Sequence, residues 1–270
     1  MNSNRRLDIE KLADNIRDEC NVAGYGFKDI FEAAYRLGYK VIRYPIGSDA
    51  FLGFSLLKDT DRIIFSNSSI ILSREIFTIA HEIGHQKLHL SEQGITMIKD
   101  NDLENRDEAE IEANYFAACL LMPDEKVNKF IRFELDDKDV FSWTGWDIAR
   151  LQTAFNVSYD MVLYRLKSLD KLNDTLFDKL QSEKIEKTAT RLLKAISGNS
   201  DLCKTTERIM VPEEFLEWVI TNYNNKLIPI ESAKKALDYI KLDIEELDLY
   251  EEDLEPEQEE SLDELLRRMN

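Results

Sequence analysis

The sequence predicts an α+β protein, in which a small antiparallel sheet and its helices are followed by an all-helical region. Two changes of pattern along the chain carry this prediction. Residues 39–66 contain short segments rich in aromatic and β-branched side chains, divided by turn-forming residues, as is typical of strands. Beyond Pro123, apolar residues recur at helical spacing. We therefore expect four regions, with bounds at 1–125, 126–170, 171–245 and 246–270.

The first region begins with two amphipathic segments, and we expect helices over 7–20 and 27–37. Three strands of an antiparallel sheet are expected next, over 39–44, 51–57 and 62–66. A helix over 73–90 follows, with Ser73 as its N-cap, and a second helix over 108–122 stops at Pro123. Further helices are expected over 124–134, 147–155, 158–169, 174–196, 215–223 and 231–240.

The net negative charge of the chain indicates which classes of molecule are not expected as its direct partners. The 270 residues include 35 Lys and Arg against 53 Asp and Glu, a formal charge of −18. Residues 241–270 hold 13 of the acidic residues and only three basic ones, and we expect the acidic tail over 246–270 to be disordered. Nucleic-acid phosphates and anionic membrane surfaces attract basic proteins, so we expect neither as a direct partner.

The cellular compartment is predicted from what the sequence lacks. No apolar run is long enough for a membrane span or a secretory signal. The three cysteines are far apart and odd in number, which does not favour a disulfide framework. We therefore expect a cytoplasmic protein.

The three histidines of the chain, His81, His85 and His89, lie within nine residues, and the first two form the sequence His-Glu-Ile-Gly-His. On a helix, residues i and i+4 lie on one face, so His81 and His85 can bind the same metal ion. Glu82 lies about 100° further around the helix, where a carboxylate can act as general base toward a metal-activated water. The pattern predicts one zinc ion per chain.

A third ligand is expected from the helix that follows the histidines. His89 lies eight residues after the first histidine, about 12 Å along a straight helix, so we expect it to pack beside the ligands without binding the metal. Glu110 continues the inward-facing stripe of the second helix, whereas Glu112 lies on another face, and we favour Glu110 as the ligand. Asn114 follows one turn later, where its oxygen can accept a hydrogen bond from a ligating imidazole.

Residues 77–89 and 110–123 resemble the two motifs of the ImmA/IrrE family of metallo-endopeptidases, and the resemblance covers about residues 25–170. It implies a minimal zincin-like metallopeptidase domain over 1–125, followed by a helix-turn-helix-like extension over 126–170.

The same resemblance implies roles for individual residues. His81, His85 and Glu110 would bind zinc, Glu82 would be the general base, and Asn114 would support a ligand. The implied activity is site-specific cleavage of a cytoplasmic protein, most often a helix-turn-helix transcriptional repressor of a mobile element or stress operon.

Other parts of the mechanism remain open at this point. Tyr115 and Arg74 are candidates for the side chain that stabilises the oxyanion of the transition state. Residues 62–67 are a candidate edge strand for holding an extended substrate. The helix-turn-helix-like segment over 148–166 carries few basic side chains, so we do not expect direct nucleic-acid binding. The rival hypotheses are a non-proteolytic, zinc-containing regulator that sequesters a repressor, and a component of a toxin–antitoxin system.

Overall fold

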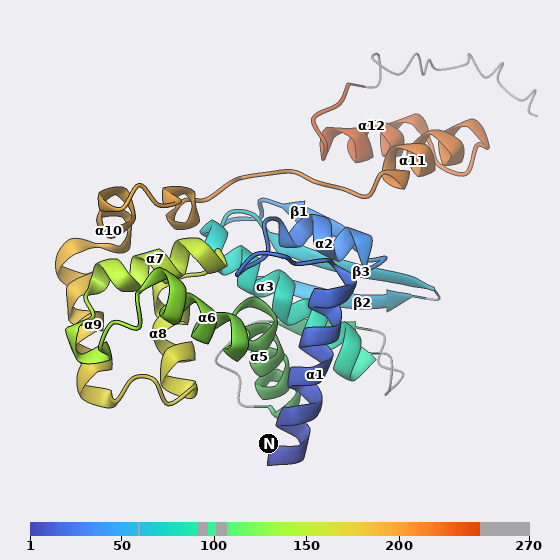
Figure 1. Cartoon of the computed structure of the whole chain (residues 1–270). Helices are drawn as coiled ribbons and strands as arrows, with labels where there is room; N and C mark the ends of the chain where they lie inside the picture. The colour runs from blue at the N-terminus through green and yellow to red at the C-terminus, as the bar shows by residue number, and fades with distance from the viewer. Residues whose placement is uncertain (59, 91–96, 101–106, 244–270) are drawn as a thin grey trace, which may run out of the picture. The chain divides into compact units, whose positions relative to one another are not determined.

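The computed structural model describes residues 1–58, 60–90, 97–100 and 107–243 (Figure 1). The chain forms two compact units, Met1–Pro212 and Glu213–Asn270. The first unit combines a four-stranded sheet with helices, and its named elements from residue 108 onward are all helices, which confirms the predicted α+β class.

The first unit opens with two helices whose beginnings are fixed by side-chain caps. Helix α1 (Ser3–Glu19) starts after Asn2, whose side-chain oxygen accepts a hydrogen bond from the amide of Arg5. Helix α2 (Ile30–Arg36) starts after Asp29, which accepts hydrogen bonds from two amides of the first turn. Such caps satisfy amide groups that have no partner within the helix.

The sheet has the strand order β1-β3-β2-β4. Strand β2 (Gly53–Lys58) is antiparallel to both neighbours, β3 (Asp61–Asn67) and β4 (Met97–Asp100), but β1 (Lys40–Tyr44) is parallel to β3. The sheet is therefore mixed, and the prediction of a purely antiparallel sheet is wrong for this one pair.

The parallel pair arises because residues 45–52 cross the end of β3 before the chain returns as β2. Asn67, the last residue of β3, holds this crossing: its side-chain amide donates hydrogen bonds to the carbonyls of Gly47 (2.8 Å) and Phe51 (3.2 Å). Strand β3 thus has a partner on each side. The prediction that residues 62–67 form an exposed edge strand is wrong, and β4, which was not predicted, is the end strand beside β2.

Helix α3 (Leu72–His85) contacts β2 and β3, and helix α5 (Glu108–Leu121) packs between α3 and α1 (Figure 1). The predicted N-cap of α3, Ser73, is wrong because the helix begins at Leu72 and its N-cap is Ile71, two residues before Ser73. At its other end α3 continues as a π-helical turn over Gln86–Leu90, in place of the regular α-helix expected there.

The rest of the first unit is helical, and its apolar side chains join the same hydrophobic core as those of α1, α3 and α5. The predicted bounds at 125 and 170 therefore lie within one compact unit. The expected helix over 174–196 is two helices, because Thr188 adopts a left-handed φ of +57° between them. The elements of this part are α6 (Asp124–Glu134), the 3₁₀ turn Val140–Ser142, α7 (Gly145–Phe155), α8 (Tyr159–Ser168), α9 (Asp174–Lys187), α10 (Ala189–Ala195) and the 3₁₀ turn Ser200–Cys203.

The second unit contains helices α11 (Glu214–Asn224) and α12 (Ile230–Asp238). They share a small core of their own, centred on Val219, Ala233 and Leu237. The predicted acidic tail over 246–270 lies outside the described residues. None of the helices that the structure describes combines the length and apolar character needed to cross a bilayer.

Candidate metal centre

Helix α3 presents two imidazoles to one carboxylate of α5. The Nε2 atoms of His81 and His85 lie 2.8 Å apart, and they lie 3.1 and 3.2 Å from the two carboxylate oxygens of Glu110. The two histidines are fully buried and Glu110 is 6% exposed. The three side chains form a group that can hold a metal ion.

The donor set and its spacing fit zinc. Bonds of about 2.0–2.1 Å in a tetrahedral site place neighbouring ligand atoms about 3.3 Å apart, close to the separations seen here. Two histidines and one glutamate leave a fourth position for a water or a substrate, which is the pattern of catalytic zinc sites and differs from the four protein ligands of structural sites.

The ionisation of Glu110 also suits a metal ligand. Burial alone would raise the pKa of this carboxyl, but hydrogen bonds from His81 and His85 outweigh that effect and lower its pKa to about 2. The carboxylate is therefore ionised near neutral pH, and this is the form that binds metal ions.

A close contact between α3 and α5 brings Glu110 to the histidines. Gly84 lies against α5, where a Cβ atom would be 2.9 Å from Phe116 Cδ1 and 3.2 Å from the Cα of Ala113. The lack of a side chain at Gly84 thus lets the two helix backbones approach.

Replacing Gly84 with alanine should reduce stability and zinc affinity together. Alanine favours a helix over glycine by about 1 kcal/mol. Overpacking against Phe116 and Ala113 costs about 1–3 kcal/mol, so we expect a net loss of up to about 2 kcal/mol in the free energy of unfolding. Urea unfolding and chelator competition measure the two effects. Gly24→Ala is the control, because its Cβ would meet only an ordinary contact at 3.5 Å. Unchanged zinc affinity in Gly84→Ala would contradict this role of the glycine.

Glu82 lies at the interface between α3 and the sheet. The hydroxyl of Ser55 on β2 lies 2.5 Å from Glu82 Oε2 and 3.0 Å from the Glu82 carbonyl oxygen. Gly53, two residues earlier on β2, also faces this carboxylate, since a Cβ there would lie 3.1 Å from Glu82 Oε1. Strand β2 therefore fixes the orientation of the Glu82 carboxylate, a role that sequence reasoning missed for Ser55.

The outward-facing nitrogens of both candidate ligands have side-chain partners. His81 Nδ1 lies 3.1 Å from the side-chain oxygen of Asn114, and His85 Nδ1 lies 2.9 Å from His89 Nδ1. His89 is buried on the π-helical turn, and burial lowers its pKa. The structure thus places Asn114 and His89 directly behind the group formed by His81, His85 and Glu110.

Glu112 does not contact the metal group, but neither is it a solvated surface residue. It is 7% exposed, and its carboxylate accepts two hydrogen bonds from Arg5 on α1, at 2.8 and 2.6 Å. These hydrogen bonds lower the pKa of Glu112. Its other neighbour is His89, whose Nε2 lies 3.4 Å from Glu112 Oε2.

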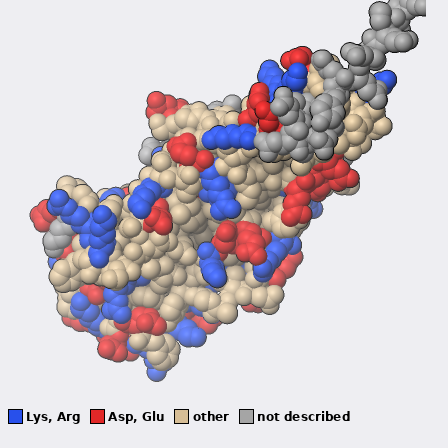
Figure 2. Space-filling view, turned by 90° about the horizontal axis from the view of Figure 1, so that it is seen from above, with Lys and Arg blue, Asp and Glu red and all other residues tan. Residues whose placement is uncertain are grey.

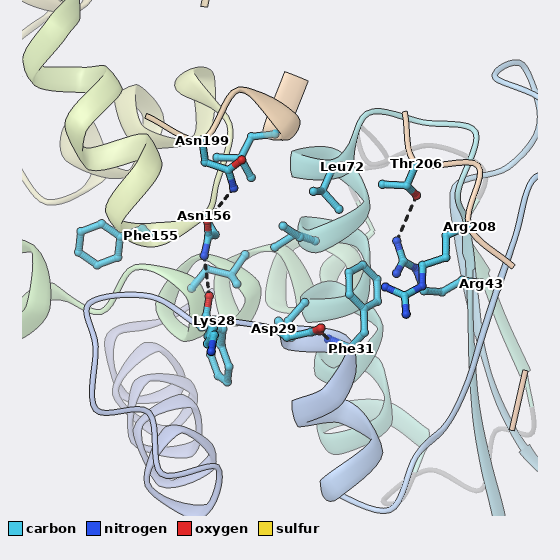
Figure 3. Close-up of a pocket in the computed structure, with 15 residues that line it drawn as sticks. Lys28, Asp29, Phe31, Arg43, Leu72, Phe155, Asn156, Asn199, Thr206 and Arg208 are labelled. Atoms are coloured by element: carbon cyan, nitrogen blue, oxygen red, sulfur yellow. Dashed lines mark hydrogen bonds between the residues drawn. The ribbon is translucent and has the colours of Figure 1, made fainter. Parts of the chain in front are cut away.

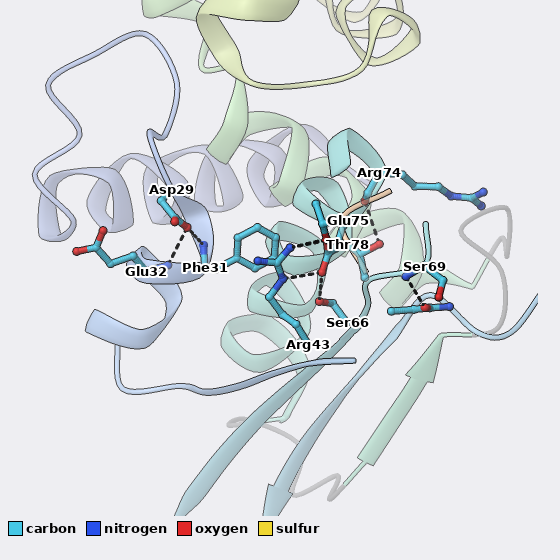
Figure 4. A network of polar contacts seen from close by, with 11 residues as sticks. Asp29, Phe31, Glu32, Arg43, Ser66, Ser69, Arg74, Glu75 and Thr78 are labelled. Atoms are coloured by element: carbon cyan, nitrogen blue, oxygen red, sulfur yellow. Dashed lines mark hydrogen bonds and ion pairs between the residues drawn. The ribbon is translucent and has the colours of Figure 1, made fainter. Parts of the chain in front are cut away.

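The two candidates for the oxyanion donor lie elsewhere. The Tyr115 hydroxyl donates a hydrogen bond to Glu10 on α1, and burial raises its pKa. Arg74 is exposed in the first turn of α3, and its side chain extends away from the neighbouring polar network (Figure 4). Among the interactions of the described residues, neither side chain contacts His81, His85 or Glu110.

A cavity of about 190 Å³ lies near the start of α3 (Figure 3). Its lining combines apolar side chains, such as Leu72 and Phe155, with the cationic groups of Arg43 and Arg208. None of the residues of the candidate metal centre lines it, so this cavity is distinct from the centre.

Comparisons with known proteins agree with this arrangement. Residues 34–167 match the model of the M78 peptidase family, described as an IrrE N-terminal-like domain. The chain is also similar to a protein called "uncharacterized immunity region protein 2" of Bacillus phage phi105, with 29% identity over 130 residues. That alignment covers 47% of this chain and 81% of the phage protein. Residues 34–167 therefore carry an IrrE N-terminal-like domain of the M78 peptidase family.

Proposed function

We propose that this protein is a zinc-dependent, site-specific endopeptidase that cleaves a cytoplasmic protein. The observation that carries the proposal is the convergence of His81, His85 and Glu110 into one group that can hold a metal ion, with Glu82, whose carboxylate is held by Ser55, next to His81 on the same helix. The family match over residues 34–167 supports a metallopeptidase.

The side chains divide the chemistry between them. A zinc ion held by His81, His85 and Glu110 would supply a Lewis acid for the scissile carbonyl and would lower the pKa of the attacking water. The Glu82 carboxylate takes a proton from the attacking water while the water oxygen forms a bond to the carbonyl carbon of the scissile peptide. Glu82 then gives the proton to the leaving amine nitrogen. Ser55 holds one oxygen of Glu82, so the base keeps its orientation through both transfers.

The sheet offers a place for an extended substrate. Strand β4 is the end strand and lies next to β2, which carries Ser55. An extended peptide can add to such an edge through main-chain hydrogen bonds. We propose that β4, in place of the interior strand β3, binds the substrate segment.

The substrate we propose is a helix-turn-helix repressor of a mobile element or stress operon. The name of the phage relative, an immunity region protein, supports a partner connected with repression. Direct DNA binding by this chain has little support, because Lys and Arg side chains are interspersed with Asp and Glu on the face shown in Figure 2 and the net charge is −18.

Mass spectrometry of protein termini in cells tests the proposal. Cells would express the wild-type protein, Glu82→Gln, or the control Glu108→Gln, which changes an exposed carboxylate at the start of α5. We expect a new terminus within a DNA-binding regulator in the wild-type and control cells. It should be lost with Glu82→Gln, because a general base contributes about 10²–10⁴-fold to the rate. If wild type and Glu82→Gln relieve repression equally and no new terminus appears, the proposal fails in favour of a regulator that sequesters its partner.

A further inference from the structure

A continuous row of polar side chains leads from the candidate metal centre to the first helix. His85 Nδ1 contacts His89 Nδ1 at 2.9 Å, His89 Nε2 lies 3.4 Å from Glu112 Oε2, and two nitrogens of Arg5 donate to the Glu112 carboxylate at 2.6 and 2.8 Å. The four residues come from three elements: α3 with its π-helical turn, α5 and α1. Only the Arg5 end is partly exposed, with 32% of its side chain accessible.

We propose that Arg5, Glu112 and His89 are positioning residues that fix the ring of His85 for metal binding. This inference rests on the proposed function, because it takes His85 as a zinc ligand.

The arrangement of nitrogens allows one consistent direction of hydrogen bonding. His85 turns its Nε2 toward Glu110, so the metal-binding form carries its proton on Nδ1. That proton is donated to His89 Nδ1, which must then be an acceptor. His89 consequently carries its own proton on Nε2, which faces the Glu112 carboxylate. Arg5 supplies the positive charge that balances Glu112.

The two candidate ligands are supported in different ways. A histidine that binds a metal commonly donates its second N–H to a carboxylate, a carbonyl or a water, which fixes the orientation of the ring. His81 follows this pattern with the side-chain oxygen of Asn114. His85 does not contact the Glu112 carboxylate directly; the buried imidazole of His89 lies between them and contacts both.

Two features argue that this row is more than a surface ion pair. The carboxylate of Glu112 and the ring of His89 are both buried, so their alignment is set by packing and not by chance contact at the surface. The turn that carries His89 is π-helical and begins directly after His85. Such turns are rare and occur frequently at functional sites.

Zinc affinity of the purified full-length protein tests the proposal, measured by competition with a chromophoric chelator. We expect His89→Phe, which keeps a ring but removes both nitrogens, to bind zinc about 10–100-fold more weakly, as is typical when a partner of a ligating histidine is lost. His89→Gln keeps an acceptor and a donor and should retain more of the affinity. Glu112→Gln and Arg5→Met should each weaken binding, and the double variant His89→Phe/Glu112→Gln should bind no more weakly than His89→Phe alone.

A second readout separates positioning from general stability. In the cobalt-loaded protein, the visible absorption bands report ligand geometry, and we expect them to change in His89→Phe, Glu112→Gln and Arg5→Met. The control is Arg6→Met, which removes a neighbouring charge on α1 that stacks on Tyr115 and not on this row; its affinity and spectrum should match the wild type. Urea unfolding of the metal-free proteins shows that each variant is folded.

The outcomes are distinguishable. If the wild-type protein binds one zinc but the folded His89→Phe protein keeps the same affinity and cobalt spectrum, the positioning role is wrong while the proposed function stands. If only stability changes in Glu112→Gln and Arg5→Met, those two residues are structural and the proposal is overturned for them. If the wild-type protein binds no zinc, the proposed function and this inference both fail.

Discussion

The Glu110→Gln protein should bind zinc at least about 100-fold more weakly than the wild-type protein, because the loss of a ligand exceeds the 10–100-fold cost of losing a residue behind one. Glutamine keeps the size of the side chain but replaces the ionised carboxylate, which is the group that α5 contributes between the two imidazoles. The remaining pair, His81 and His85, provides only two of the three ligands of a catalytic zinc site.

Thermal and urea unfolding with and without zinc provide an independent measure. A ligand that binds only the folded state stabilises it by about 2.7 kcal/mol at a concentration 100 times its dissociation constant. The wild-type protein should therefore gain this stability when zinc is added and lose it when a chelator is added. Glu110→Gln should show little of either effect at the same zinc concentration.

Two controls sharpen this result. Glu108→Gln removes an exposed carboxylate two residues earlier on the same helix and should leave zinc affinity unchanged. Glu112→Gln changes a buried carboxylate that does not face the two Nε2 atoms, and it should weaken binding less than Glu110→Gln does. Equal zinc affinity in Glu110→Gln and wild type would show that this carboxylate is not a ligand.

The parts of the centre that were predictable are those governed by spacing along one helix. The separation of His81 and His85 places both rings on one face of α3, and the apolar stripe of α5 selects Glu110 over Glu112 for the inward position. Helix periodicity also gave the approximate bounds of most helices. These features depend on local geometry, which a sequence encodes directly.

The parts that were not predictable depend on how distant elements meet. Ser55 reaches Glu82 only because the sheet register points it at α3, and Arg5 reaches Glu112 across 107 positions of sequence. The parallel pairing of β1 with β3 arises because residues 45–52 cross the end of β3, and no pattern of residues in that segment predicts the crossing. Thr188 breaks a helical pattern without a glycine or proline to mark the break.

Another such long-range contact is the buried ion pair between Arg43 on β1 and Glu75 on α3 (Figure 4). Two guanidinium nitrogens donate to the carboxylate at 2.8 and 2.7 Å, and both side chains are at most 3% exposed. The Ser66 hydroxyl donates to the same carboxylate at 2.9 Å. On its other side the guanidinium lies 3.6 Å from the ring centroid of Phe31.

Removing either charge alone should destabilise the protein by about 3–5 kcal/mol, since the partner would be left buried without its counter-ion. We expect this loss in the free energy of unfolding of Arg43→Met and of Glu75→Gln, measured by urea unfolding of the metal-free proteins. The matched control is Glu32→Gln, which breaks an ion pair with Arg36 whose side chains are 58% and 62% exposed. Exposed pairs contribute about 0–1 kcal/mol, so the control should change little.

The double variant Arg43→Met/Glu75→Gln, which combines the two single substitutions, decides what the pair does for the fold. If each single variant suffers mainly from the unpaired charge that it leaves, the double variant should lose far less stability than the sum of the two single losses. Additive losses would instead mean that each side chain acts through its own contacts, Arg43 through Phe31 and Thr206, and Glu75 through Ser66. Glu75 lies in the first turn of α3, and His81 lies less than two turns later on the same helix. A double variant that loses far less stability than the sum of the single losses would therefore mean that the attraction between Arg43 and Glu75 fixes the start of the helix that presents the candidate ligands.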